Sequence, residues 1–431
     1  MTAMSHEARI HDILDRAAQP AAAHVFTTLL ADQAIAAARA ADQGLNTGPL
    51  AGVPVSVKDL YDIAGRTTLA GSVQRRDAAP VASDALAVQR LRAAGAAIVG
   101  LTNMTEFAFS GIGLNPHYGT PRNPADAQTA RIPGGSSSGA AVSVALGLCF
   151  AGLGSDTAGS IRIPAALCGL VGFKSTQSRT PLQGAFPLSF TLDTVCALAR
   201  SVADCLLMDG VLAGEPLQVT ARSVQSLRLA VPQTLMLEGL QPEVAAAFEN
   251  ALTRLAAAGA VITELPLAEL AEIVQINAPG GLSSIEAWTT HRQAMLHQQG
   301  LLDPRVAIRI ALGEGVSAAD YITIQQRRRD WIGRVEQRLA PFDALVCPTV
   351  PLTAPAIAEV AASHEAFFRI NTQLLRNTFP INFLDGCAFS LPCHQAGDLP
   401  VGLMLAAPGG HDAALAGVAL AVEPLLGPPY R

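Results

Sequence analysis

The sequence lacks the features that mark secreted, membrane-anchored or disulfide-rich proteins. Its seven cysteines form no CxxC pair, and the N-terminus has no basic region followed by an apolar stretch and a cleavage site. A disulfide framework or a targeting peptide would require such patterns. We therefore predict a cytoplasmic protein without a membrane anchor, whose thiols are reduced and mostly buried.

Charged residues are also scarce, at 15% of the chain, and the formal net charge is −6. This balance argues against nucleic-acid binding as the main function. The basic run Arg327 to Arg329 lies in a helical pattern together with Asp330 and Glu336, which favours a solvated helix face. The nine histidines show no metal-ligand spacing, so we predict neither a metal nor a cofactor.

Half of the 431 residues are apolar, which is enough for a large core. Patterns of helix and strand alternate along the chain and predict an α/β fold, in which helices cover both faces of a large central sheet. The expected helices span residues 5–17, 24–43, 84–94, 138–148, 242–258, a block from 282 to 339, and 413–425. The expected strands span residues 52–58, 97–101, 149–154, 227–231, 261–265, 343–347, 388–393 and 401–406.

The stretch from Gly134 to Pro164 carries the strongest functional signal, and its first interpretation is a membrane span. Residues 132–155 contain no charged side chain and are long enough to cross a bilayer. Their glycines and serines would place many polar or helix-weakening residues in lipid, and Pro133 and Pro164 bracket the run. A helix followed by a buried strand fits better.

A second interpretation is the nucleophile elbow of an esterase. Gly135 to Gly139 matches G-x-S-x-G with Ser137 at the centre. An elbow must follow a strand directly, but Pro133 and Gly134 stand in the way. The mechanism also needs a histidine, for which His411 is the loop candidate near the C-terminus.

The third interpretation takes both serine-containing turns together. The first is Gly134-Gly135-Ser136-Ser137-Ser138-Gly139, and the second runs from Gly152 through Asp156, Ala158 and Ser160-Ile161-Arg162 to Pro164. Over about thirty residues, this pattern resembles the long signature of the amidase signature family. The segment Gly52 to Asp59 also resembles the part of the family that supplies a lysine. The resemblance covers most of the chain.

The resemblance implies a fold and a domain. The fold is a single large domain with a central mixed, mostly parallel β-sheet covered by helices on both faces, and the domain spans residues 1–431. Within it we expect a helical N-terminal part over residues 1–50 and a more variable, helix-rich part over about residues 210–340.

The resemblance also implies a catalytic triad. Lys58 takes the position of the base, Ser136 that of the bridging serine after a non-proline cis peptide, and Ser160 that of the nucleophile. A serine hydroxyl needs a neighbouring base, and burial lowers the pKa of a lysine enough to make its neutral amine a workable one.

The second turn is expected to bind the oxyanion of the transition state. The backbone N–H groups of Thr157, Ala158 and Gly159 are the expected donors. Asp156 is expected to shape the turn and Arg162 to brace it, with binding of a substrate carboxylate as another role for Arg162. A short helix opened by Pro164 should follow, and Phe107 to Ser110 are candidates for the acyl pocket.

The predicted function is hydrolysis of a small carboxamide to a carboxylic acid and ammonia or an amine, through an acyl-enzyme on Ser160. One alternative is the glutamine-hydrolysing component of a transfer-RNA-dependent amidotransferase, which would use the same triad and pass ammonia to partner subunits. The other is the Ser-His-Asp esterase that uses Ser137. The expected partner is a small-molecule amide, with neither nucleic acid nor membrane, and the default assembly is a homodimer.

Overall fold

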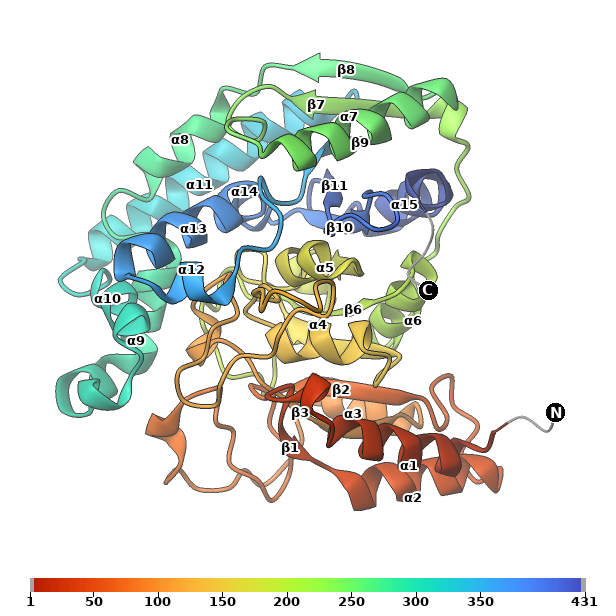
Figure 1. The fold of residues 1–431 in the computed structure, drawn as a ribbon. Coiled ribbons are helices and arrows are strands. Elements are labelled where there is room, and N and C mark those ends of the chain that lie inside the picture. Colours follow the sequence, from red (N-terminus) through yellow and green to blue (C-terminus); the bar gives the residue numbers. More distant parts are fainter. Residues whose placement is uncertain (1–3, 428–431) are drawn as a thin grey trace.

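A single sheet of eleven strands organises residues 4–427, the part of the chain that the computed structural model describes (Figure 1). The strands lie in the order β1-β3-β2-β4-β6-β5-β10-β11-β9-β7-β8. Their bounds are β1 Phe26–Leu29, β2 Pro54–Lys58, β3 Ala97–Thr102, β4 Ala151–Ser155, β5 Val171–Lys174, β6 Val195–Ala199, β7 Arg228–Pro232, β8 Val261–Leu265, β9 Ala344–Pro348, β10 Cys387–Pro392 and β11 Gly402–Ala407. The single-domain α/β fold with a large mixed sheet is thus confirmed.

The expectation that the sheet is mostly parallel is wrong. Six of the ten strand pairings within residues 4–427 are antiparallel, and the four parallel ones join β2 to β3 and β4, and β7 to β8 and β9. Parallel pairs need a crossover, usually a helix, and such crossovers occur only at the two ends of the sheet. The central strands β6, β5, β10, β11 and β9 pair antiparallel instead.

Helices cover both faces of the sheet. On one face, α1 (His6–Ala17), α2 (Ala31–Asp42), α4 (Ser138–Ala145) and α5 (Arg162–Cys168) share a hydrophobic cluster, and α8 (Glu269–Ile276), α11 (Ala318–Leu339) and α14 (Phe379–Phe383) share a second. On the other face lie α3 (Leu86–Ala93), α6 (Val202–Ala213), α7 (Pro242–Ala257) and α15 (Asp412–Leu426). The remaining helices are α9 (Leu282–His297), α10 (Pro304–Ala311), α12 (Ile357–Ala361) and α13 (His364–Arg376).

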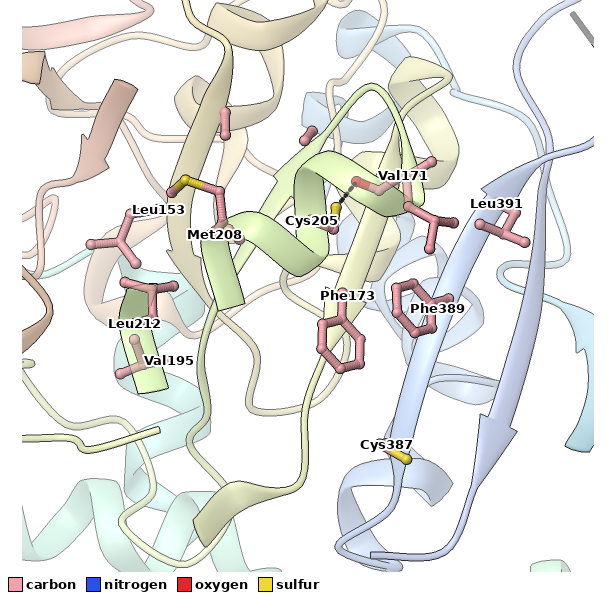
Figure 2. Packing of buried hydrophobic residues seen from close by; sticks show 14 of the residues in the cluster. Leu153, Val171, Phe173, Val195, Cys205, Met208, Leu212, Cys387, Phe389 and Leu391 are labelled. Atoms are coloured by element: carbon pink, nitrogen blue, oxygen red, sulfur yellow. Dashed lines mark hydrogen bonds between the residues drawn. The ribbon is translucent and has the colours of Figure 1, made fainter. Parts of the chain in front are cut away.

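The side chains of each strand alternate between these two layers, as the period of two requires. Figure 2 shows the layer under α6 at the middle of the sheet, where Phe173 of β5 and Phe389 of β10 stack with ring centres 4.1 Å apart. These strands belong to distant parts of the sequence and are paired through Phe389 and Phe173. The contact packs the N-terminal and C-terminal portions of the sheet together as one core.

Several local expectations need correction. The helix expected over residues 24–43 begins only at Ala31, because Phe26–Leu29 form the edge strand β1 beside β3. Neither β5 nor β6 was among the expected strands. The short helix after the second turn begins at Arg162, two residues before Pro164. Within the described residues, no helix is both long and apolar enough to span a membrane.

Candidate active site

Lys58 is the last residue of β2, and the alternation of that strand decides where its side chain points. Val55 and Val57 face the layer that contains α3 and α6, so Ser56 and Lys58 face α4. The hydroxyl of Ser56 lies 2.9 Å from that of Ser143 on α4. Lys58 is completely buried and reaches toward the residues just before α4.

The Lys58 ammonium has hydroxyl partners. Its Nζ donates to Ser136 Oγ at 2.7 Å and to Ser155 Oγ at 2.8 Å. Burial lowers the pKa of Lys58 to about 7, although the charges of Cys196, Asp193 and Asp156 act in the opposite direction. A large fraction of Lys58 is therefore a neutral amine at neutral pH.

The first serine turn holds Ser136 in a fixed position. The peptide between Gly135 and Ser136 is cis, as the resemblance implies. The Ser136 carbonyl oxygen accepts from Thr105 N–H at 3.1 Å, and Gly135 N–H donates to Gly111 O at 2.8 Å. A Cβ atom on Gly135 would lie 2.6 Å from the Gly113 backbone nitrogen, so this position requires glycine.

A buried ion pair fixes the second turn. Asp156 accepts from the backbone N–H groups of Gly159 at 2.8 Å and Ile161 at 3.2 Å, and from Nε and Nη2 of Arg162 at 3.0 and 2.9 Å. Burial alone would raise the pKa of Asp156, but the charge and hydrogen bonds of Arg162 hold it well below its usual value. The expected roles of Asp156 and Arg162 in shaping and bracing the turn match this geometry.

Arg162 has no room for a second role as a ligand for a substrate carboxylate. Besides Asp156, its guanidinium donates to Thr378 O at 3.1 Å and to Asn382 Oδ1 at 2.5 Å, and its side chain is completely buried. The expectation of a substrate-binding Arg162 is therefore wrong.

The two serine turns are in direct contact. Ser137 N–H donates to the Ser160 carbonyl oxygen at 3.3 Å. Among residues 4–427, Ser160 Oγ forms no hydrogen bond, and Ser136 Oγ bonds only to Lys58. The structure thus brings Lys58 and Ser136 into contact and places Ser160 on the adjoining turn, with its hydroxyl unengaged.

The expected oxyanion donors differ in their availability. The N–H of Gly159 is engaged by Asp156, so in this conformation it is not a free donor. The N–H groups of Thr157, Ala158 and Ser160 have no acceptor in the described part of the chain. Two side chains secure this segment: the Thr157 hydroxyl donates to Asp193 Oδ1 at 2.5 Å, and Thr378 donates to Ala158 O at 2.6 Å.

A small cavity opens beside Ser155, the second partner of Lys58. Its lining residues are mainly apolar and include three with polar side chains, Ser155, Asp193 and Tyr61. It is lined by Leu60, Tyr61, Ala108, Ser155, Leu182, Ala185, Phe186, Leu188, Asp193 and Val195. Of the expected segment Phe107 to Ser110, only Ala108 lines this cavity.

The structure does not support the esterase interpretation. Ser137 is completely buried, and its hydroxyl contacts only the backbone of Ser155, at 3.4 Å from the carbonyl oxygen and 3.5 Å from the nitrogen. His411 lies on an exposed loop and its ring bonds to Gly409 O at 3.2 Å. Because Ser137 lacks a nearby base within residues 4–427, its match to G-x-S-x-G is a coincidence of sequence.

Sequence reasoning assigned no role to two residues of the site, Ser155 and Asp193. Ser155 ends the strand beside β2, so its position immediately before Asp156 could have indicated a neighbour of Lys58. Asp193 lies in a loop 36 residues after Thr157, and no spacing rule connects the two. Burial raises the pKa of Asp193 to about 6, opposed by the hydrogen bond from Thr157.

Comparisons with known proteins agree with this architecture. The family model described as Amidase matches residues 9–416. The chain is 40% identical over 395 residues to 2-amino-5-chloromuconic acid deaminase of Comamonas testosteroni, covering 90% of this chain and 84% of the relative. It is 34% identical over 447 residues to the A subunit of the Glutamyl-tRNA(Gln) amidotransferase of Moorella thermoacetica, covering 92% and 88%.

A solved structure described as an amidase superimposes with a TM-score of 0.88 at 32% identity, covering 98% of this chain and 97% of the other. The family match spans both serine turns and the strand that carries Lys58. The chain therefore belongs to the amidase signature family and is an enzyme that hydrolyses amides.

Proposed function

We propose that Lys58, Ser136 and Ser160 form the catalytic triad, with Lys58 as base, Ser136 as proton relay and Ser160 as nucleophile. The observation that carries this proposal is the contact between Lys58 Nζ and Ser136 Oγ at 2.7 Å, in surroundings that bring the pKa of the lysine to about 7. A general base is most effective when its pKa lies near the working pH. A hydroxyl is also the partner that a relay needs, since it accepts one proton while donating another.

The reaction then has two halves. Ser160 Oγ forms a bond to the amide carbonyl carbon while its proton passes to Ser136, whose own proton passes to neutral Lys58. The C–N bond breaks, the proton returns through Ser136 to the departing nitrogen, and an ester to Ser160 remains. Water repeats the sequence on this ester, which releases the carboxylic acid and restores Ser160.

Thr157, Ala158 and Ser160 supply the proposed backbone donors to the oxyanion. Their N–H groups have no acceptor in the described part of the chain, whereas Gly159 N–H already bonds to Asp156. Donors fixed in advance stabilise the charge that develops on the carbonyl oxygen, and each contributes about 3 to 4 kcal/mol. The ion pair of Asp156 with Arg162 keeps the turn in this conformation.

The proposed substrate is a small carboxamide, and we propose that the enzyme acts alone in the cytoplasm as a homodimer. We also propose that residues 1–50 form a helical N-terminal part. Residues from about 210 to 340 form the more variable, helix-rich part of this proposal. One observation supports the amidotransferase alternative: a relative in that class aligns with 92% of this chain. Glutaminase activity that rises on addition of the partner subunits would favour it.

The triad is tested by following ammonia release from a panel of small amides. Ser160→Ala should abolish turnover and the acyl-enzyme mass shift of wild type, since the nucleophile is gone. Ser137→Ala is the matched control, because it removes a hydroxyl from the same pair of turns that bonds only to the Ser155 backbone. Turnover by Ser160→Ala, or its loss in Ser137→Ala alone, would overturn the assignment.

A further inference from the structure

The loop before β6 supports the start of the nucleophile turn, residues 156–160. Asp156 and Thr194 exchange two backbone hydrogen bonds, from Asp156 N–H to Thr194 O at 2.9 Å and from Thr194 N–H to Asp156 O at 3.1 Å. The Thr157 hydroxyl donates to Asp193 Oδ1 at 2.5 Å. The turn is therefore attached to this loop through its backbone and through one side chain.

Asp193 is fixed by its own loop. Its Oδ2 accepts from the Leu188 N–H at 2.9 Å and the Ser189 N–H at 3.0 Å, and its backbone N–H donates to Ser189 O at 2.7 Å. The side chain is buried. The position of Asp193, and with it that of the Thr157 hydroxyl, therefore depends on the position of Ser189.

Glu286 of α9 holds the same loop from the helical layer. Its Oε2 accepts from the Ser189 hydroxyl at 2.6 Å and the Thr191 N–H at 3.1 Å. Its Oε1 accepts from the Thr191 hydroxyl at 2.7 Å and from the Tyr321 hydroxyl of α11 at 2.9 Å. Glu286 is 1% exposed, and these four donors are neutral. A carboxylate buried in this way is stable only while its hydrogen bonds are kept.

The contacts end at the backbone N–H groups of Thr157 and Ala158. Each of these residues has one side-chain anchor, because Thr378 donates to Ala158 O at 2.6 Å and the Thr157 hydroxyl binds Asp193. Oxyanion donors are effective when their direction is fixed before the reaction. A shift of the loop that carries Asp193 would turn the donors of Thr157 and Ala158 away from the oxyanion.

Resting on the proposed function, we propose that Glu286 is a positioning residue for the oxyanion donors, acting on Thr157 through Asp193. Glu286 holds the Ser189 hydroxyl, and the Ser189 backbone holds Asp193. Asp193 then holds the Thr157 hydroxyl. Helices α9 and α11 thereby influence the rate of hydrolysis, although none of their described residues lines the cavity beside Ser155.

The first test replaces the acceptor of these four hydrogen bonds. On the amide of the panel that wild type hydrolyses best, Glu286→Met should lower kcat by about 10- to 100-fold with KM nearly unchanged, since misplaced donors affect the transition state. Glu286→Gln should keep most of the rate. Its amide oxygen still accepts from Ser189 and Thr191, and its NH₂ group can donate to the Tyr321 hydroxyl oxygen. Equal losses in the two variants would contradict the link.

Glu423→Met is the matched control for the loss of a carboxylate. Glu423 of α15 is partly buried and accepts from the Val202 N–H at 2.8 Å, on the other face of the sheet. Its replacement should lower the free energy of unfolding and leave kcat unchanged. A drop in kcat as large as that of Glu286→Met would show that the effect is a general loss of stability.

A double-mutant cycle with Thr157→Val tests the route. Valine has the shape of threonine without the hydroxyl, so the bond to Asp193 is lost. In this background Glu286→Met should lower kcat by no more than about 2-fold, whereas independent effects would add in full. Ser189→Ala is a milder second variant if Glu286→Met does not fold. It should also lower kcat in wild type and have no effect in Thr157→Val.

Hydrogen exchange separates this inference from the proposed function, because it requires no turnover. The N–H groups of Gly159 and Ile161 bond to Asp156, and their exchange should be faster in Glu286→Met than in wild type and unchanged in Glu423→Met. If no amide is hydrolysed while this pattern holds, the proposed function fails and the link stands. Wild-type exchange in folded Glu286→Met, or its full effect on kcat in Thr157→Val, would overturn the link.

Discussion

Lys58 and Lys174 lie in the same sheet, and both are buried, yet their surroundings differ in one decisive respect. Lys58 donates to two hydroxyl groups, whereas Lys174 donates to two backbone carbonyl oxygens, Ser175 O at 2.9 Å and Gly386 O at 2.7 Å. Burial lowers the pKa of both lysines, and the charge of Arg162 lowers that of Lys174 further. Burial alone therefore does not distinguish a catalytic lysine from a structural one.

The difference lies in what each partner can do with a proton. A hydroxyl accepts a hydrogen bond and donates its own proton onward, while a carbonyl oxygen only accepts. Lys58 is thus connected to a path for protons, and Lys174 ties the end of β5 to the turn before β10. The comparison predicts that replacement by methionine reduces mainly the activity at Lys58 and mainly the stability of the fold at Lys174.

The largest effect is expected for Lys58→Met. Loss of the base should lower kcat/KM for any accepted amide by about 10⁴-fold, the size found when a member of a cooperating triad is removed. The steady-state rate and the rate of acyl-enzyme formation measure this loss. A variant that keeps more than a tenth of the wild-type rate would remove Lys58 from the mechanism.

A second effect concerns the ion pair that shapes the nucleophile turn. Arg162→Met should lower the free energy of unfolding by about 3 to 5 kcal/mol, because Asp156 is left buried and charged without its partner. Urea denaturation measures the change. An exposed pair provides the control: Arg334→Met, which breaks the pair with Glu272, should cost no more than about 1 kcal/mol. Equal costs for the two variants would contradict the account of the turn.

Lys174→Met tests whether Lys174 stabilises the fold without taking part in catalysis. Two carbonyl oxygens lose their donor, so the free energy of unfolding should fall by about 1 to 3 kcal/mol while kcat/KM stays within a few-fold of wild type. Denaturation and steady-state kinetics on one preparation give both values. A loss of activity as large as that of Lys58→Met, in a folded variant, would show that carbonyl partners do not define a structural lysine here.

The smallest effect is expected for Ser155→Ala. The Ser155 hydroxyl accepts a hydrogen bond from the Lys58 ammonium and so stabilises the charged form. Its removal should lower the pKa of Lys58 below about 7 and move the acidic limb of the pH profile of kcat/KM to lower pH. A shift of that limb to higher pH would contradict the assigned donor and acceptor.

The sequence allowed much of this site to be predicted, but by two different routes. The alternating valines of residues 52–58 and the small-residue stretch after Gly134 predict a strand and a helix from local chemistry. The contact of Lys58 with Ser136 bridges 78 positions, and only the resemblance to a family placed these residues together. The cis peptide before Ser136 was predicted from the same resemblance.

The features that were missed depend on tertiary pairing. Phe26–Leu29 form a strand because β3 lies beside them, and the preceding and following residues gave no local sign of it. The antiparallel centre of the sheet follows from the neighbours that β5 and β10 find in space. Gly159 was expected as an oxyanion donor because its neighbours fit a glycine turn, but the direction of its N–H depends on the Asp156 carboxylate.

The most direct measurement of the central claim is the pH dependence of kcat/KM for the wild-type enzyme. Lys58 acts as a base only when it has lost its proton, so the rate should rise with pH and level off above a pKa of about 7. Lys174→Met should retain this limb. A rate that does not change between about pH 6 and 8, or a limb near the ordinary lysine pKa of about 10.4, would contradict the account.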